Sequence, residues 1–209
     1  MNRNEILSEE LNKKQQAILW RQRLFEAESG LNKYLIELKG GVFFDEWIQI
    51  KKEIYESIPT SFEPTLWKKA FFNAQALMEK FVVNHFGHDD IELWANFNAT
   101  IHMIVEIPRL PGPLGPLERF RQQLELYQSE MKFFQIDQNR ATLNITRCGI
   151  WKYRELARSN GVVITLKSPC EYCTVATNAN ITAKGYKADF ELLDTNGVRG
   201  CSWTVQNSL

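Results

Sequence analysis

The chain changes character at a segment rich in proline and glycine. Within nine residues it contains Pro108, Pro111, Gly112, Pro113, Gly115 and Pro116. Proline lacks a backbone N–H and clashes with the preceding helical turn, so one helix cannot run through this segment. Before it, apolar residues recur at helical spacing, and after it they alternate with polar residues. The segment therefore separates a helical N-terminal part from a strand-rich C-terminal part.

The helical part carries five amphipathic patterns. We predict helices over residues 5–28, 32–38, 44–57, 64–86, and from residue 89 or 90 to 105. Gly30 is expected to end the first helix and the Gly40-Gly41 pair the second, because glycine commonly follows a helix C-terminus. Pro64 suits the first turn of the fourth helix.

The C-terminal part alternates apolar and polar residues in two hairpins. After a short helix near 117–124, we predict strands over 127–135 and 141–146, a helix over 149–159, and a hairpin turning at 194–197. The expected fold class is α+β, with an N-terminal helical layer packed on a C-terminal antiparallel sheet that contains one or two inserted helices. The expected division is an N-terminal helical extension over 1–41 and a main domain over 42–209, helical to 124 and sheet from 125.

Charge and hydropathy limit the expected partners. Lys plus Arg and Asp plus Glu number 25 each, and no basic block predicts nucleic-acid binding. No apolar run is long enough to span a bilayer and no signal region opens the sequence, so we expect a cytoplasmic protein that does not bind membranes. The charged N-terminal helix is a candidate homodimer contact.

Four cysteines, Cys148, Cys170, Cys173 and Cys201, all lie in the C-terminal part. Clustered thiolates suit zinc, and disulfides are rare in a reducing cytosol, so we predict a zinc site with these four ligands. Four thiolates would form a closed structural site, whereas three would leave a position for water. Two alternatives stay open, buried inert cysteines and a redox pair. We expect the redox pair to require a helix start after a parallel strand, a context that this sequence does not predict.

Other candidate site residues lie in the helices and near the proline-rich segment. His102, on an apolar helix, is a candidate acid or base with Glu106, although a hydrogen-bonded core histidine is the default. Cys173 is a candidate nucleophile if it is not a ligand. The candidate substrate-binding residues are Arg109, for a carboxylate, and Trp94, Phe97 and Tyr153, for an apolar surface, against the alternatives of solvated arginine and plain aromatic core.

His85 and His88 stand beside two aspartates. A second metal site is one interpretation of this polar cluster, and a solvated helix end is the better one.

Three segments carry a resemblance to a known family. They are Ile145-Thr146-Arg147-Cys148, Pro169-Cys170-Glu171-Tyr172-Cys173 and Gly197-Val198-Arg199-Gly200-Cys201-Ser202-Trp203. Their order resembles the L-2-amino-thiazoline-4-carboxylic acid hydrolase family and the related vinyl-reductase-like small-molecule-binding domains. The family tends to show Cys-x-x-Asp and an Asp-Phe after the last cysteine. Here Cys173 replaces that first Asp, and Ser202-Trp203 replaces the Asp-Phe.

The resemblance implies hydrolysis of a cyclic, amidine-like thiazoline carboxylate beside a zinc site. We therefore expect a small-molecule hydrolase that acts on a carboxylate-bearing substrate and breaks a C–N bond. The alternatives are a zinc-stabilised small-molecule-binding or sensory module, and a metallo-tailoring enzyme of specialised metabolism on the same scaffold.

Overall fold

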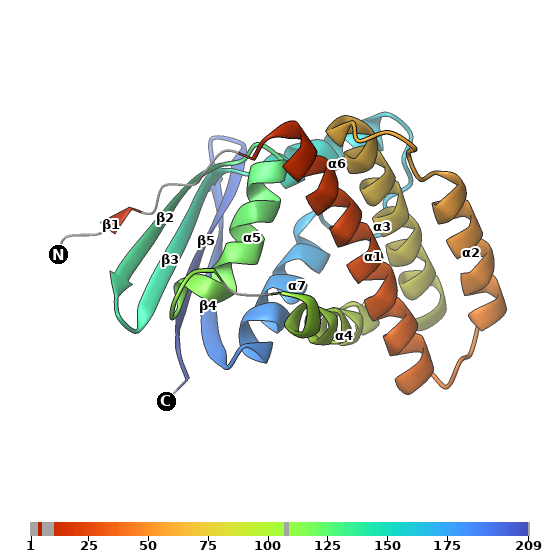
Figure 1. Cartoon of the computed structure of the whole chain (residues 1–209), viewed down its shortest axis with the longest axis horizontal. Coiled ribbons are helices and arrows are strands. Elements are labelled where there is room, and N and C mark those ends of the chain that lie inside the picture. Colours follow the sequence, from red (N-terminus) through yellow and green to blue (C-terminus); the bar gives the residue numbers. More distant parts are fainter. Residues whose placement is uncertain (1–3, 6–10, 107–108, 209) are drawn as a thin grey trace. The chain divides into compact units, whose positions relative to one another are not determined.

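The computed structural model describes residues 4–5, 11–106 and 109–208 (Figure 1). Mutual contacts group these residues into two compact units. The helical unit holds the described residues of Glu10–Ile104 and Gly161–Ala176, and the sheet unit holds those of Met1–Glu9, Val105–Asn160 and Thr177–Leu209. The expected α+β class is confirmed. The boundaries proposed after residues 41 and 124 stay a prediction.

The first helix of the helical unit, α1 (Lys13–Glu37), begins at a capping box. Asn12 Oδ1 accepts the Gln15 N–H at 3.0 Å, and Gln15 Oε1 accepts the Asn12 N–H at 2.9 Å. These two bonds satisfy backbone donors that have no partner inside the helix. The predicted start of this helix at residue 5 falls outside its observed bounds.

α1 continues through Gly30, so the predicted end at this glycine and the separate helix over 32–38 are wrong. The reason is packing against α4 (Asp90–Val105). A Cβ on Gly30 would lie 1.6 Å from Asn98 Oδ1. Glycine is therefore needed here for the close approach of two helices, and it serves inside α1 instead of ending it.

The next two helices match their predictions. α2 (Phe44–Glu56) and α3 (Pro64–Phe86) agree with the predicted 44–57 and 64–86 to within one residue. Pro64 occupies the first turn of α3, where a missing N–H costs nothing, and Gly87 follows with a φ of 90°. α3 contacts both α1 and α2. The largest side chains fully buried in this unit include Trp20, Trp47, Trp94, Tyr34, Phe72 and Met78.

The sheet unit is built on five antiparallel strands. They are β1 (Asn4–Glu5), β2 (Glu130–Asp137), β3 (Arg140–Arg147), β4 (Tyr186–Thr195) and β5 (Val198–Asn207), in the order β1-β2-β3-β5-β4. Both predicted hairpins are present, β2–β3 and β4–β5. In the second turn, Asn196 and Gly197 have positive φ angles of 54° and 80°, which is the backbone a tight two-residue hairpin requires.

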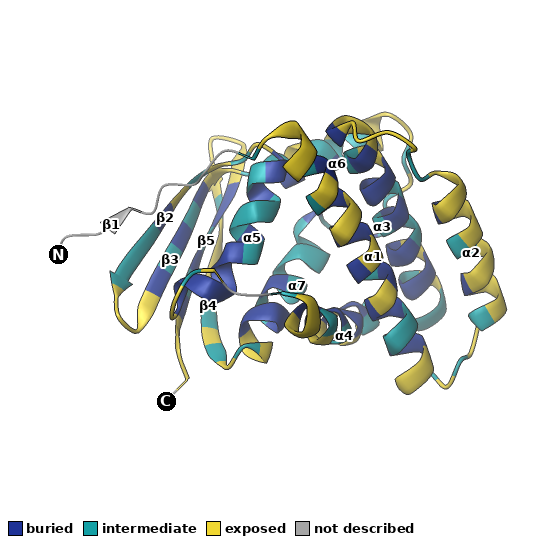
Figure 2. Cartoon of the chain, viewed as in Figure 1, coloured by how far each residue is buried: buried dark blue, intermediate teal, exposed yellow. Residues whose placement is uncertain are grey.

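The sheet has one apolar face, which contacts α5 (Leu114–Leu126). On that face Leu143 pairs with Trp203, and Trp203 pairs with Phe190. The Trp203 ring meets the Phe120 ring of α5 edge-on at 5.8 Å. Figure 2 shows the alternation of buried and more exposed residues along β3 that this one-sided packing produces.

α5 begins earlier than the predicted 117–124, inside the proline-rich segment. Pro113 caps it and Pro116 lies in its first turn. Backbone N–H groups in a first turn have no partner within the helix, so proline is tolerated there. The segment therefore ends one helix and starts another.

Two more helices follow in the C-terminal part. α6 (Gly149–Ser159) confirms its prediction. α7 (Cys170–Ala183) was not predicted, and it begins at the cysteine pair. It starts in the helical unit and ends in the sheet unit. Among the described helices, none combines the length and the apolar composition needed to cross a membrane.

Candidate functional site

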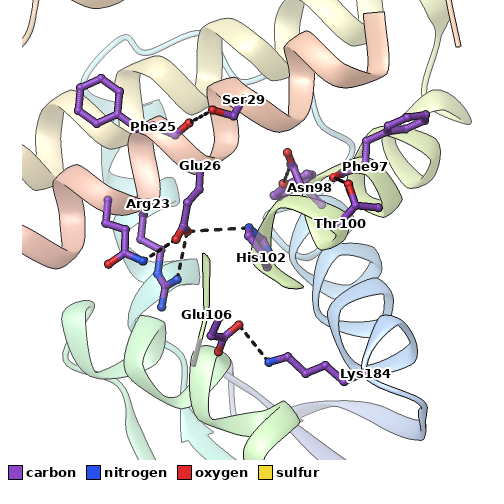
Figure 3. A network of polar contacts seen from close by, with 12 residues as sticks. Arg23, Phe25, Glu26, Ser29, Phe97, Asn98, Thr100, His102, Glu106 and Lys184 are labelled. Atoms are coloured by element: carbon purple, nitrogen blue, oxygen red, sulfur yellow. Dashed lines mark hydrogen bonds and ion pairs between the residues drawn. The ribbon is translucent and has the colours of Figure 1, made fainter. Parts of the chain in front are cut away.

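Glu26 of α1 is a buried carboxylate that lies close to the predicted site residue His102. Its Oε2 lies 3.2 Å from Arg23 Nη1 and 4.0 Å from His102 Nε2 of α4, as Figure 3 shows. Its Oε1 accepts a hydrogen bond from Gln22 Nε2 at 2.6 Å. Arg23 and Glu26 are each 5% exposed and His102 is 8% exposed. We call Arg23, Glu26 and His102 the Glu26 cluster.

Helical spacing explains how α1 builds this cluster. Gln22, Arg23 and Glu26 stand at i, i+1 and i+4, so the first two reach the carboxylate of the third from the preceding turn. A buried carboxylate is costly unless it is paired, and Arg23 supplies the opposite charge. A carboxylate beside an imidazole stabilises the protonated imidazolium. The cluster therefore places the Glu26 carboxylate beside the His102 imidazole.

Glu106, predicted as the carboxylate partner of His102, has another partner. Lys184 Nζ lies 3.0 Å from Glu106 Oε2, and both side chains are largely buried (Figure 3). This ion pair belongs to the sheet unit, whereas His102 belongs to the helical unit. Sequence reasoning missed Glu26 because nothing in its local pattern distinguishes it from the exposed charges of α1.

The four predicted substrate-binding residues have separate surroundings. Trp94 is fully buried and packs on the Tyr172 ring at 4.7 Å. Phe97 is half-buried and meets Tyr34 edge-on at 5.9 Å. Both rings belong to the packing of the helical unit, in line with the alternative of plain core.

The other two lie in the sheet unit. Tyr153 meets Tyr127 edge-on at 5.4 Å, and burial raises the pKa of its hydroxyl. Arg109 is exposed, and its backbone N–H donates to Glu118 Oε2 at 3.0 Å. The exposed guanidinium agrees with the alternative of a solvated arginine.

Two of the four cysteines belong to the sheet unit. Cys148 caps α6, with its Sγ accepting the Trp151 N–H at 3.4 Å. Burial raises the pKa of the Cys148 thiol, against the opposing effect of N–H groups from Trp151 and Ile150. Cys201 is buried in β5 opposite Ile145.

The other two, Cys170 and Cys173, lie half-buried in the first turn of α7 within the helical unit. All four cysteines are reduced.

The four ligands of the predicted zinc site are divided between the two units. Among the residues that the structure describes, no group of three or more His, Cys, Asp or Glu side chains is placed to hold a metal ion. Zinc therefore stays a prediction, which metal analysis together with thiol titration would test.

The two histidines beside the aspartates also have protein partners. His85 Nε2 lies 3.2 Å from Glu46 Oε2, and its ring packs on Phe43 at 4.2 Å. His88 Nδ1 lies 2.6 Å from Glu171 Oε1 of α7. These contacts fit a polar helix end better than a second metal site.

A surface pocket of about 330 Å³ lies in the helical unit. It is lined by Arg21 and Phe25 of α1, by loop residues 58–62, and by Trp67 of α3. The Arg21 guanidinium lies 5.6 Å from the centre of the Phe62 ring. The wall is mostly apolar with one cationic group, a composition common in small-molecule sites. Sequence reasoning missed this pocket because its wall includes a connecting loop.

We compared the chain with known proteins. No protein-family model, curated protein or solved structure matches it.

Proposed function

We propose that this protein is a small-molecule hydrolase that opens a cyclic, amidine-like carboxylate of the thiazoline type, with His102 as general base. The observation that carries the proposal is the buried pairing of His102 with Glu26 at 4.0 Å. The resemblance of the three cysteine-bearing segments to the thiazoline-carboxylate hydrolases supports the substrate class. Zinc has no part in the proposed step.

The proposed chemistry uses the Glu26 cluster as a proton acceptor. His102 removes a proton from water as the oxygen attacks the amidine carbon, and it passes this proton to the ring nitrogen. The ring C–N bond then breaks as His102 moves the remaining proton of the added hydroxyl to the same nitrogen, which leaves as an amine and leaves a carbonyl behind. One water is added and no other reactant is needed. In this proposal Glu26 stabilises the imidazolium that forms each time His102 takes up a proton, and Arg23 pairs with the Glu26 carboxylate. A distance of 4.0 Å is compatible with this role because catalytic contacts often shorten when substrate binds.

The test is ring opening of 2-amino-thiazoline-4-carboxylate by the purified chain, followed by mass spectrometry. We expect His102→Gln to lower kcat/KM by about 10²- to 10⁴-fold, the range typical of a lost general base. Glu26→Gln should lower kcat less than His102→Gln, because it keeps the base and removes only the carboxylate beside it.

The matched control is His85→Gln, in the same unit but outside the Glu26 cluster. It should leave kcat/KM unchanged. Urea unfolding of each variant separates lost chemistry from lost folding. If folded His102→Gln opens the ring as fast as the wild type does, His102 is not part of the mechanism. If the wild type does not open the ring, the hydrolase proposal is wrong.

The pocket at Arg21 favours a second candidate function, binding of a small aromatic carboxylate without chemistry. The Arg21 guanidinium would hold the carboxylate while the ring of the ligand packs on Phe25 and Phe62. Benzoate should quench the fluorescence of Trp67 in the pocket wall, whereas benzyl alcohol should not. Arg21→Gln should weaken benzoate binding roughly tenfold or more, the equivalent of one charge-assisted hydrogen bond.

The control for this second candidate is Arg140→Gln, an exposed arginine of β3. Equal benzoate binding by the wild type and Arg21→Gln would rule out the pocket as the carboxylate site.

A further inference from the structure

The first turn of α7 is held in place by the two residues between its cysteines. Glu171 Oε1 lies 2.6 Å from His88 Nδ1, and Glu171 Oε2 accepts the Lys167 N–H at 2.5 Å. Tyr172 packs on the Trp94 ring at 4.7 Å. Its hydroxyl accepts a hydrogen bond from Asn98 Nδ2. All these contacts lie inside the helical unit, so the start of α7 has a defined orientation there.

Helix geometry places the two cysteines on the opposite face of this turn. Successive residues turn by about 100°, so Cys170 and Cys173 point about 60° apart while Glu171 and Tyr172 point to the other side. Residues three apart on a helix have Cβ atoms about 5–6 Å apart, close enough for a disulfide after a small adjustment. Both cysteines are half-buried, so solvent reaches this face. The contacts of Glu171 and Tyr172 do not have to break when the sulfur atoms join.

The two cysteines lie in the first turn of α7, together with one carboxylate, Glu171. The unpaired N–H groups of a helix start attract negative charge, and cysteines at such positions react readily. Glu171 lies between them, but its carboxylate is engaged by His88 and the Lys167 N–H.

We propose that Cys170 and Cys173 form a dithiol that exchanges with small disulfides, a function beyond the hydrolase activity and independent of it. The Cys170 thiolate attacks one sulfur of a low-mass disulfide, and one thiol leaves. The Cys173 thiolate then attacks Cys170 in the mixed disulfide, and the second thiol leaves. The protein loses two thiol protons and two electrons, and the small disulfide becomes two thiols. The helix start, absent from the sequence prediction, supplies part of the context that a redox pair requires.

The experiment equilibrates the full chain in buffers of oxidised and reduced glutathione, in the presence of a chelator. Remaining thiols are then alkylated and mapped by peptide mass. We expect one internal disulfide, joining Cys170 to Cys173, while Cys148 and Cys201 are recovered as alkylated thiols.

Two variants make the test specific. Cys173→Ser should stop at a stable mixed disulfide on Cys170, and the control Cys148→Ser should form the same internal disulfide as the wild type. A disulfide elsewhere in the wild type would overturn the proposal, as would recovery of both Cys170 and Cys173 as alkylated thiols from the most oxidising buffer. In a parallel sample without chelator, protection of all four thiols that the chelator then removes would also overturn it, in favour of the predicted zinc site. Ring opening is measured separately, so failure here leaves the hydrolase proposal standing.

Discussion

Gly30 shows how one missing side chain sets the distance between two helices. A Cβ at this position would lie 1.6 Å from Asn98 Oδ1 and 2.9 Å from Asn98 Cα. We expect Gly30→Ala to lower the free energy of unfolding by about 1–3 kcal/mol through overpacking, although alanine alone favours a helix by about 1 kcal/mol. Urea denaturation is the measurement.

Ser29→Ala, on the exposed side of the same helix, should change stability little. In a double-mutant cycle, Asn98→Ala should reduce the cost of Gly30→Ala, because it removes the side chain that the new methyl group would meet. A Gly30→Ala variant more stable than the wild type would contradict this account.

The Tyr34 hydroxyl is expected to make the folded protein less stable at alkaline pH. Burial raises the pKa of its hydroxyl above the ordinary value of 10.0, and the hydrogen bond to Asp90 and the charge of Asp90 raise it further. A group whose pKa is higher in the folded state contributes stability that is complete below its unfolded pKa and declines above it. We therefore expect the free energy of unfolding to fall with increasing pH above about pH 10.

Tyr34→Phe should reduce this alkaline slope, measured by urea unfolding from neutral pH to pH 11. The variant also loses the bond to Asp90 at 2.8 Å, so it should be less stable at neutral pH. Tyr55 is a useful comparison, because its hydroxyl bonds Glu28 and its pKa is raised to about 12. An unchanged slope in Tyr34→Phe would mean that other groups cause the alkaline loss.

At the scale of elements, the contact between α5 and the sheet depends on aromatic rings around Trp203. Phe120 of α5 is 7% exposed and meets Trp203 edge-on, whereas Phe190 of the edge strand β4 stacks on Trp203 and is 46% exposed. We expect Phe120→Ala to cost about 3–5 kcal/mol of stability, as for a buried ring. Phe190→Ala should cost clearly less stability, because folding removes less of the Phe190 ring surface from water. Equal costs in chemical denaturation would argue against α5 as the main cover of the sheet.

The same scale shows which elements local sequence can predict. α2, α3 and both hairpins were predicted because apolar periodicity and turn residues agree there. α7 was missed because Cys170–Ala183 has no continuous apolar stripe and is rich in threonine and asparagine, which favour helices weakly. Its first turn is held by long-range contacts, such as Tyr172 on Trp94, that no local pattern reveals.

At the scale of the whole molecule, the balance of acidic and basic residues predicts how solubility varies with pH. The chain has 25 basic and 25 acidic residues and an isoelectric point near 6.8. Proteins near zero net charge associate more readily because repulsion between copies is weakest. We expect the lowest solubility near pH 7 and higher solubility at pH 9, measured by polyethylene glycol precipitation. A minimum far from neutral pH would show that association does not follow net charge.

The sequence by itself determined the α+β class, the order of most elements and the types of residue available for chemistry. These follow from periodicity, turn residues and composition, all of which are local. Only the tertiary structure decided that Glu26 is the carboxylate beside His102, that Glu106 pairs with Lys184, and that the cysteines divide between two units. Such pairings join residues that are distant in sequence. They depend on how the elements pack, and no repeating pattern along the chain reveals them.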